Sequence, residues 1–280
     1  MRIRVIDAFT DRPFAGNPAA VCLLDGDTWP DEAWMRRVAA EMNLSETAFA
    51  HPLPAGSDAD WALRWFTVVQ EVNLCGHATL ATAYALAADG RVTGDRVRFA
   101  SRGGVLTAHT GDGEAITLDF PAASTAETPA LDGLAEALGA KPDAQYGTGP
   151  LGDVLARYPD EATVRGLAPD FPLLGPTLEE HGFRGVIATA AADAGAPYDF
   201  VSRFFAPAAL GGANPEDPVT GSAHTALATY WSARLGRDEL AGLQASARTG
   251  LVRTALRGDR VHLTGRAVPV LDGELLVDPS

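Results

Sequence analysis

The chain begins with alternating apolar and polar positions, a pattern typical of a strand with one buried face. In residues 2–8, Ile3 and Val5 lie on one side and Arg2 and Arg4 on the other, and this period of two predicts a strand. Residues 31–42 carry apolar side chains at four-residue spacing behind an acidic first turn, which predicts a helix. Further strands are predicted at residues 19–24, 47–51, 62–67, 96–100, 105–110, 115–119, 185–190, 199–205, 260–264 and 275–278.

Two segments depart from this alternation because they have almost no polar side. Residues 78–88 are eleven uncharged residues in a row, and residues 222–235 are almost uncharged as well. A helix that is apolar all round has to be buried on every side. We therefore expect these two helices to be the most buried elements of the chain.

The two apolar helices also align with one another. With an offset of 145 residues, Glu71 matches Glu216. At the same offset Gly76 matches Gly221, and each helix follows a strand of the form Arg-aromatic-Phe. The repeat predicts an α+β fold of two pseudo-symmetric lobes, each a barrel-like, mostly antiparallel sheet around a buried central helix. We place the N-terminal lobe at residues 1–118, closed by the last strand at about 266–280, and the C-terminal lobe at residues 119–265.

Charge and composition argue against several classes of protein. The 22 basic and 36 acidic residues give a net charge of −14, so neither nucleic acid nor a membrane is an expected partner, because both attract basic surfaces. Lys141 is the only lysine and lies at a predicted helix end, which argues against Schiff-base, pyridoxal and Walker-type phosphate sites. Cys22 and Cys75 are too few for a disulfide framework. The chain also lacks an apolar run of ~18 residues, and we expect a cytoplasmic protein.

Two further patterns are not expected to bind a cofactor or a metal. Residues 147–152 satisfy G-x-G-x-x-G, but no strand is predicted before them and no helix after them. The six histidines are scattered, and none has the spacing of metal ligands. The sequence therefore predicts neither a cofactor nor a metal site.

Glu46 is the first candidate for chemistry. It lies between a predicted helix end and a strand, and its neighbours Leu44, Ala48 and Phe49 are apolar. Burial in such a setting disfavours the ionised carboxylate and raises its pKa toward the range useful for proton transfer. The alternative interpretation is a capping or surface glutamate.

The start of the first apolar helix is the second candidate. Gly76, His77 and Ala78 lie in its first turn, where backbone amides without intrahelical partners favour an anion such as a carboxylate. His77 adds a titratable group at the same place.

The second apolar helix begins in the same way. Gly221, Ser222 and Ala223 occupy its first turn, and Asp217 precedes it next to a proline. Ordinary helix capping by Thr220 or Ser222 is the alternative explanation. Because both starts carry glycine and titratable residues, we favour a functional site for an anion, either a carboxylate or a phosphate, over capping.

These motifs, taken in order along the chain, resemble the phenazine-biosynthesis PhzF-like isomerase family. The resemblance rests on Asp7–Pro18, Asn43–Glu46, Leu74–Leu80 and Glu216–His224, and it continues to Gln244–Gly250 and the last strands. It implies a fold similar to that of diaminopimelate epimerase, with two lobes and an active site between them. It also implies an enzyme that needs no cofactor and forms a homodimer.

The resemblance further implies roles for individual residues. Glu46 is the acid and base that moves a proton, His77 and Asp217 assist or orient, and Gly221 and Ser222 help to hold the substrate carboxylate. In the characterised branch of the family the reaction isomerises trans-2,3-dihydro-3-hydroxyanthranilate. We therefore expect a cofactor-independent isomerase of a small carboxylate.

Two departures from the family pattern leave the substrate open. Cys75 precedes Gly76 where the phenazine branch has no cysteine, and Thr249 interrupts an expected Arg-Gly-Gly run. An amino-acid epimerase on the same fold is one alternative, but it needs two opposed bases, and the positional partner of Cys75 is Thr220. A non-catalytic binding or scaffold protein is the other alternative.

Overall fold

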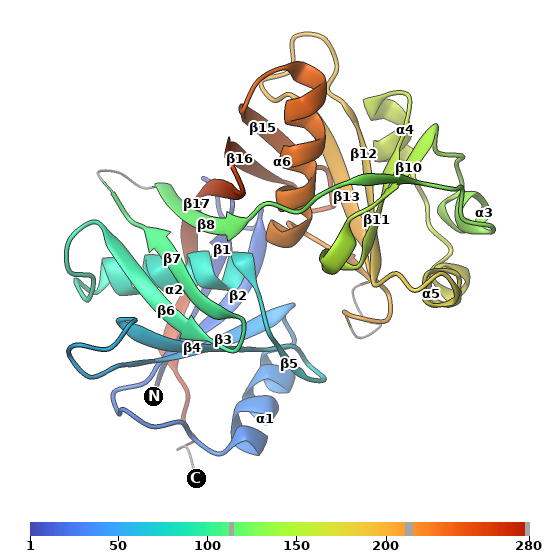
Figure 1. Cartoon of the computed structure of the whole chain (residues 1–280). Helices are drawn as coiled ribbons and strands as arrows, with labels where there is room; N and C mark the ends of the chain where they lie inside the picture. Colours follow the sequence, from blue (N-terminus) through green and yellow to red (C-terminus); the bar gives the residue numbers. More distant parts are fainter. Residues whose placement is uncertain (112–114, 211–214, 278–280) are drawn as a thin grey trace. The chain divides into compact units, whose positions relative to one another are not determined.

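The alternating strands and the two apolar helices form two units (Figure 1). The computed structural model describes residues 1–111, 115–210 and 215–277. Unit 1 consists of residues 1–119 together with 264–280, and unit 2 consists of residues 120–263.

In unit 1 the strands close into a barrel. Hydrogen bonding runs from β1 through β2, β3, β4, β6, β7, β8 and β17 back to β1. Helix α2 (Gly76–Ala88) packs against β1, β2, β3 and β7, whereas α1 (Glu32–Met42) packs against β3 and β4. The strands are β1 (Arg2–Ala8), β2 (Asn17–Leu23), β3 (Glu46–Pro52), β4 (Trp61–Phe66), β5 (Glu71–Val72), β6 (Arg96–Ser101), β7 (Gly104–His109), β8 (Ala115–Pro121) and the later part of β17 (Arg260–Glu274).

Unit 2 repeats this order of pairing. The parallel pair β11–β12 corresponds to β2–β3, the antiparallel pair β12–β13 to β3–β4, and the parallel pair β13–β15 to β4–β6. The fold class expected from the sequence is therefore confirmed. The strands are β9 (Ala126–Thr128), β10 (Ala144–Gly147), β11 (Asp153–Arg157), β12 (Gly185–Ala191), β13 (Phe200–Phe205), β14 (Glu216–Asp217), β15 (Glu239–Gln244), β16 (Gly250–Arg257) and the start of β17. The helices are α3 (Leu134–Leu138), α4 (Glu161–Gly166), α5 (Phe171–Glu180) and α6 (Gly221–Leu235), with one 3₁₀ turn at Gly149–Leu151.

The two apolar helices are enclosed as their composition predicts, except at their ends. In α2 the side chains of Leu80, Ala81 and Ala83 are all 0% exposed although they point in different directions. In α6 burial extends from Gly221 to Ser232 on most positions. The last turns, at Ala87–Ala88 and Ala233–Leu235, are exposed, so the expectation of burial over the whole of 78–88 and 222–235 is wrong there.

The end of the chain differs from the sequence expectation. One strand, β17, continues from Arg260 to Glu274, and residues 275–277 are not a strand; residue 278 lies outside the described residues. The continuous strand depends on Gly265, because a Cβ at this position would lie 2.3 Å from the Phe9 ring. The glycine-rich residues 147–152 join the antiparallel strands β10 and β11 through the 3₁₀ turn, so no helix follows them and the motif is not a dinucleotide fingerprint.

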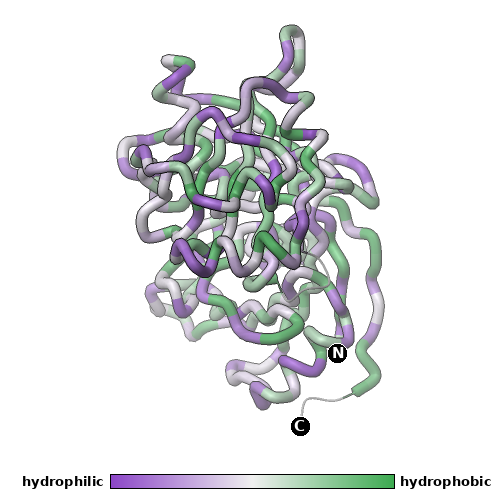
Figure 2. The backbone as a smooth tube through the Cα atoms, turned by 90° about the vertical axis from the view of Figure 1, so that its right-hand side faces the viewer, coloured by the Kyte–Doolittle hydropathy of each residue, from purple (hydrophilic) through white to green (hydrophobic). Residues whose placement is uncertain are grey.

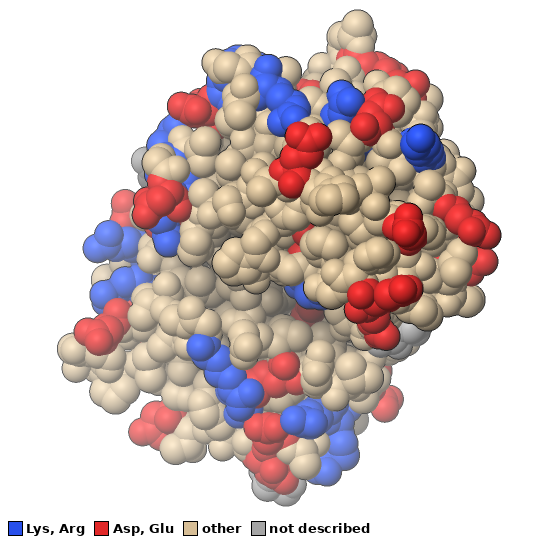
Figure 3. Space-filling view, turned by 45° about the vertical axis from the view of Figure 1, so that its right-hand side comes forward, with Lys and Arg blue, Asp and Glu red and all other residues tan. Residues whose placement is uncertain are grey.

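Hydropathy and charge vary over short distances along the folded chain. Figure 2 shows hydrophobic and hydrophilic segments following one another closely along the backbone. On the face drawn in Figure 3, acidic and basic side chains are interspersed among uncharged residues. Within the described part of the chain, no helix combines the length and apolar character needed to cross a membrane.

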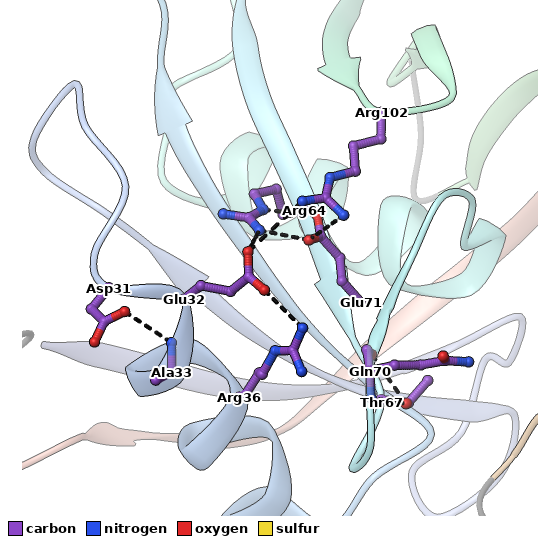
Figure 4. Close-up of polar contacts among 9 residues, drawn as sticks. All are labelled: Asp31, Glu32, Ala33, Arg36, Arg64, Thr67, Gln70, Glu71 and Arg102. Atoms are coloured by element: carbon purple, nitrogen blue, oxygen red, sulfur yellow. Dashed lines mark hydrogen bonds and ion pairs between the residues drawn. The ribbon is translucent and has the colours of Figure 1, made fainter.

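An ion-pair network in unit 1 holds the segment that leads into α2 (Figure 4). Arg64 on β4 donates from Nε to Oε1 of Glu71 on β5 over 2.8 Å and from Nη2 to Glu32 on α1 over 2.7 Å. Arg102 adds a 2.8 Å ion pair to Glu71, whose side chain is only 3% exposed. The network therefore fixes β5, from which the chain continues to the first turn of α2.

Unit 2 uses the same device at the equivalent place. Arg203 on β13 binds both carboxylate oxygens of Glu216 on β14, at 2.7 Å and 2.8 Å. Both arginines also lie over the phenylalanine ring two residues later, with Arg64 5.0 Å from the centroid of Phe66 and Arg203 4.8 Å from that of Phe205. The Arg-aromatic-Phe and glutamate repeat in the sequence thus corresponds to the same ion pair in both units, in which one arginine binds both oxygens of one carboxylate.

Replacing Arg64 with methionine should destabilise unit 1 markedly. The substitution removes one of the two arginines that pair with the buried Glu71 carboxylate and leaves Arg102. Removing one partner of a buried ion pair costs about 3–5 kcal/mol of stability. We expect a cost near the lower end of this range, because Arg102 still pairs with Glu71. Arg36→Met is the matched control, because Arg36 forms an exposed pair with Glu32 four residues earlier, worth about 0.3–0.5 kcal/mol. Urea unfolding of the two variants measures the difference, and equal costs would contradict the role of Arg64.

Candidate functional site

Unit 1 brings Glu46, His77, Asn17 and Cys75 together. His77 Nε2 lies 3.2 Å from Glu46 Oε2, and Asn17 Nδ2 lies 3.0 Å from His77 Nδ1. Cys75 Sγ is 3.6 Å from His77 Nδ1 and 4.0 Å from Nε2. All four residues are buried, with exposures of 9% or less. The structure therefore places Glu46, predicted to move a proton, in direct contact with His77, predicted to assist or orient.

Local backbone geometry explains how Glu46 and Asn17 reach this cluster. Asn43 ends α1 in the left-handed conformation, with φ 49°, which asparagine tolerates well, and the chain then turns into β3 with Glu46 as its first residue. Gly16 has φ +66°, and a Cβ there would lie 2.1 Å from the carbonyl oxygen of Ala8. Only glycine therefore allows the turn that places Asn17 at the start of β2.

Burial keeps His77 neutral. It lowers the pKa of His77 from its usual 6.5 to about 3, because the charged imidazolium is poorly solvated inside the unit. With Asn17 Nδ2 donating to Nδ1, the ring proton is on Nε2, the nitrogen that lies 3.2 Å from Glu46 Oε2. Asn17 therefore sets the tautomer that faces Glu46.

The first turn of α2 is enclosed within unit 1. Gly76, His77 and Ala78 are all buried. In the described part of unit 1, the side chain of the N-cap residue Cys75 makes no capping hydrogen bond, so side-chain capping does not account for this start. Thr79 Oγ1 instead donates to the Cys75 carbonyl over 2.6 Å.

Unit 2 holds Asp217 in a separate buried network. Thr220 Oγ1 donates to Asp217 Oδ2 over 2.6 Å. Gln244 donates from Nε2 to the Asp217 carbonyl over 2.7 Å, and its Oε1 accepts from the Thr220 amide over 2.8 Å. Asp217 is 6% exposed and Gln244 is 0% exposed. The side-chain amide of Gln244 thus fixes the whole turn between β14 and α6.

The start of α6 is not explained by capping from Thr220. Its hydroxyl is bound to Asp217, and within the described residues it makes no capping hydrogen bond. Gly221 and Ala223 are buried, while Ser222 is partly exposed and accepts a 3.4 Å contact from Arg184 Nη2. The backbone amides of this turn therefore keep the character of an anion site.

Sequence reasoning missed three residues that shape these two clusters. In the sequence, Asn17 and Gln244 belong only to segments that carry the family resemblance, and no pattern points to Arg184. For Asn17 a signal was available, since an asparagine between glycine and proline at a strand start is able to turn its amide inward. The contacts of Gln244 and Arg184 depend on residues 27 and 38 positions away, which no local pattern indicates.

Two repeated sheets, each around a buried helix whose first turn carries a polar cluster, define a protein of the diaminopimelate epimerase-like class. The profile of the PhzC-PhzF family, described as phenazine biosynthesis-like protein, matches residues 6–273. The chain belongs to this family, and the resemblance stated from the sequence is confirmed.

Relatives and solved structures agree with this assignment. The chain is 45% identical to an uncharacterized isomerase of Pseudomonas aeruginosa, over 96% of both chains. It is similar to the crystal structure of a PhzF family protein from Enterococcus faecalis, with 38% identity, a TM-score of 0.88 and 99% of each chain covered. A predicted epimerase of Pseudomonas aeruginosa, at 22% identity and a TM-score of 0.74 over 99% of each chain, shares the fold.

His224 on α6 makes stability depend on pH in a defined window. It is 0% exposed and its Nδ1–H donates to the Thr220 carbonyl over 2.8 Å. Burial lowers its pKa from 6.5 to about 4, partly offset by this hydrogen bond. Between these two values the unfolded chain binds a proton on His224 that the folded chain does not, so falling pH favours unfolding.

We therefore expect His224→Gln to be less sensitive to acid than the wild type. As pH falls from 6.5 to about 4, the stability advantage of the wild type should shrink by about 1.36 kcal/mol per pH unit. Urea unfolding of both proteins across this range measures the difference in stability. His77 is present in both proteins, so its own titration cancels from this difference. A difference that stays constant with pH would mean that His224 titrates normally in the folded state.

Proposed function

We propose that this protein is a cofactor-independent isomerase that moves a proton within a small carboxylate, with Glu46 as the acid and base. The observation that carries the proposal is the 3.2 Å contact between His77 Nε2 and Glu46 Oε2. The neutral imidazole of His77 adds no positive charge that would stabilise the ionised form of the buried Glu46 carboxylate, so this contact leaves Glu46 able to accept a proton. The names of relatives as isomerases support the reaction class.

The proposed step moves one proton and one double bond. Glu46 takes a proton from a substrate carbon next to a conjugated system, and the electron pair of the broken C–H bond shifts into that system. The protonated Glu46 then returns the proton to a carbon further along, so the atoms of substrate and product are the same. His77 Nε2–H orients the Glu46 carboxylate throughout, and Asn17 holds the His77 tautomer.

Substrate binding is proposed for the first turns of both apolar helices. In unit 1 the amides of Gly76 and Ala78 bind a substrate carboxylate. On the basis of the family resemblance, we add the unit 2 backbone amides of Gly221, Ser222 and Ala223, which donate hydrogen bonds to the substrate carboxylate. Asp217 is added as an orienting group. A homodimer is proposed on the same basis. The substrate of the phenazine branch is one candidate among small cyclic carboxylates.

Glu46→Gln should reduce proton transfer by roughly 10²–10⁴-fold or more, because the amide keeps the shape of the side chain and removes its basicity. The measurement is deuterium exchange from solvent into a panel of small cyclic and amino carboxylates, which labels a substrate even without net conversion. Glu41→Gln, on the exposed side of α1, is the matched control and should exchange at the wild-type rate.

The same assay separates Glu46 from Asp217. Asp217→Asn should affect proton transfer less than Glu46→Gln, since Asp217 is assigned an orienting role. Wild-type exchange in Glu46→Gln together with lost exchange in Asp217→Asn would move the base to Asp217 and overturn the assignment.

A two-base epimerase is the second candidate, favoured by the position of Cys75 beside His77. Its equivalent in unit 2 is Thr220, whose hydroxyl is bound to Asp217 and is no base. We therefore expect Cys75→Ala to lower exchange by less than about tenfold. A loss of ~10³-fold or more in kcat with intact folding would instead support a thiol base.

A further inference from the structure

Three potential metal ligands meet in unit 1, although no local spacing in the sequence indicates them. In the described part of the chain, ligand atoms of Glu46, Cys75 and His77 all lie within 4.8 Å of one another. Cys75 and His77 come from the start of α2 and Glu46 from the start of β3. The three side chains are buried, with exposures of 9%, 6% and 3% for Glu46, Cys75 and His77.

We propose that Glu46, Cys75 and His77 form a binding site for one divalent transition-metal ion of the Zn²⁺ type. The site provides one oxygen, one sulfur and one nitrogen ligand and leaves a fourth position for water or an anion, as in zinc sites with three protein ligands. This binding does not depend on the function proposed above.

The distances agree with a tetrahedral ion after small side-chain movements. Bonds of about 2.3 Å to sulfur and about 2.0–2.2 Å to nitrogen and oxygen separate tetrahedral N and O ligands by about 3.4 Å and N and S ligands by about 3.6 Å. The structure has 3.2 Å between His77 Nε2 and Glu46 Oε2, and 4.0 Å between Cys75 Sγ and His77 Nε2. These two ligand pairs are therefore within a few tenths of an ångström of tetrahedral separations, and the third pair, Cys75 Sγ and a Glu46 oxygen, lies within 4.8 Å and reaches about 3.6 Å after rotation of the side chains.

The donor chemistry selects the class of ion. A thiolate with an imidazole favours Zn²⁺, Co²⁺ and similar ions, whereas Mg²⁺ and Ca²⁺ prefer oxygen ligands alone. On binding, the Cys75 thiol loses its proton to solvent, and the sulfur lone pair forms the bond to the ion.

Asn17 is placed to support the histidine ligand. When Nε2 binds the ion, the ring proton is on Nδ1, and this N–H donates to Oδ1 of Asn17 after rotation of the Asn17 amide. A metal-binding histidine commonly has such a carbonyl partner at its other nitrogen, and removing the partner weakens binding about 10–100-fold. If the proposed function holds, a bound ion occupies the Glu46 lone pair and stops proton transfer reversibly.

The test is a Co²⁺ titration of the untagged, reduced and chelator-treated full chain. Binding should saturate at one ion per chain, with the near-ultraviolet absorption of a Co²⁺–thiolate bond, and Zn²⁺ should displace the Co²⁺. Cys75→Ala and Cys75→Ser should both lose the thiolate absorption. Cys22→Ala is the matched control and should keep it, because Cys22 is a fully buried core residue on β2 outside the ligand cluster.

Two further variants test the other ligands. Glu46→Gln and His77→Asn should each weaken Co²⁺ binding by at least about 10–100-fold, the loss known for supporting residues alone. Far-ultraviolet circular dichroism shows whether each variant is folded. If one of the two Cys75 variants does not fold, the other still tests the thiolate ligand. Thiolate absorption that persists without Cys75, or the absence of one-to-one binding to the wild type, overturns the proposal.

This experiment is independent of turnover. If the wild-type chain binds Co²⁺ but exchanges no deuterium into the substrate panel, the result supports the metal site and contradicts the proposed isomerase activity. If the chain exchanges deuterium in a Glu46-dependent way but binds no ion, the result supports the isomerase activity and overturns the metal site.

Discussion

The enclosure of a helix without a polar face is the constraint on which the rest of the structure depends. α2 and α6 can be stable only if a sheet surrounds them, because each exposes apolar side chains in every direction. Alanine, threonine and glycine keep these helices thin enough for strands to pack closely around them. The same enclosure brings the first turn of each helix, with its unsatisfied amides, into the interior. A buried helix start whose first amides lack intrahelical partners is thus a consequence of the barrel.

The two units keep this scaffold and differ in what they attach to it. Thr79 on α2 and His224 on α6 occupy equivalent positions, and both donate to the carbonyl of the N-cap residue, at 2.6 Å and 2.8 Å. The Arg–Glu pairs before each helix are also equivalent. At the next equivalent positions the chemistry diverges, since unit 1 has Cys75 where unit 2 has Thr220. Unit 1 therefore has a thiol beside its histidine, whereas unit 2 has a hydroxyl bound to Asp217.

The sequence predicts the repeat and the candidate residues well because both leave local signals. Uncharged helices, the Arg-aromatic-Phe strands and the glycine-led helix starts can each be read within ten or so residues. The contact of Glu46 with His77 cannot be read in this way, because 31 residues separate them and only the closed barrel brings β3 next to the start of α2. The same holds for the approach of Cys75 to Glu46, which no local spacing indicates. The full length of β17 is hard to predict for a different reason. Glycine and proline, here Gly265 and Pro269, are usually signs of a strand end, whereas the observed strand continues through both.

Neutrality of His77 connects the fold to the proposed chemistry. An imidazolium beside Glu46 would stabilise the carboxylate in its ionised form and make it a poor acceptor for a proton from carbon. Burial lowers the pKa of His77 to about 3, and Asn17 holds the neutral ring with Nε2–H toward Glu46. The ring is buried because it lies in the first turn of a helix that must be enclosed. The barrel that encloses an apolar helix therefore also supplies the neutral imidazole that the role proposed for Glu46 requires.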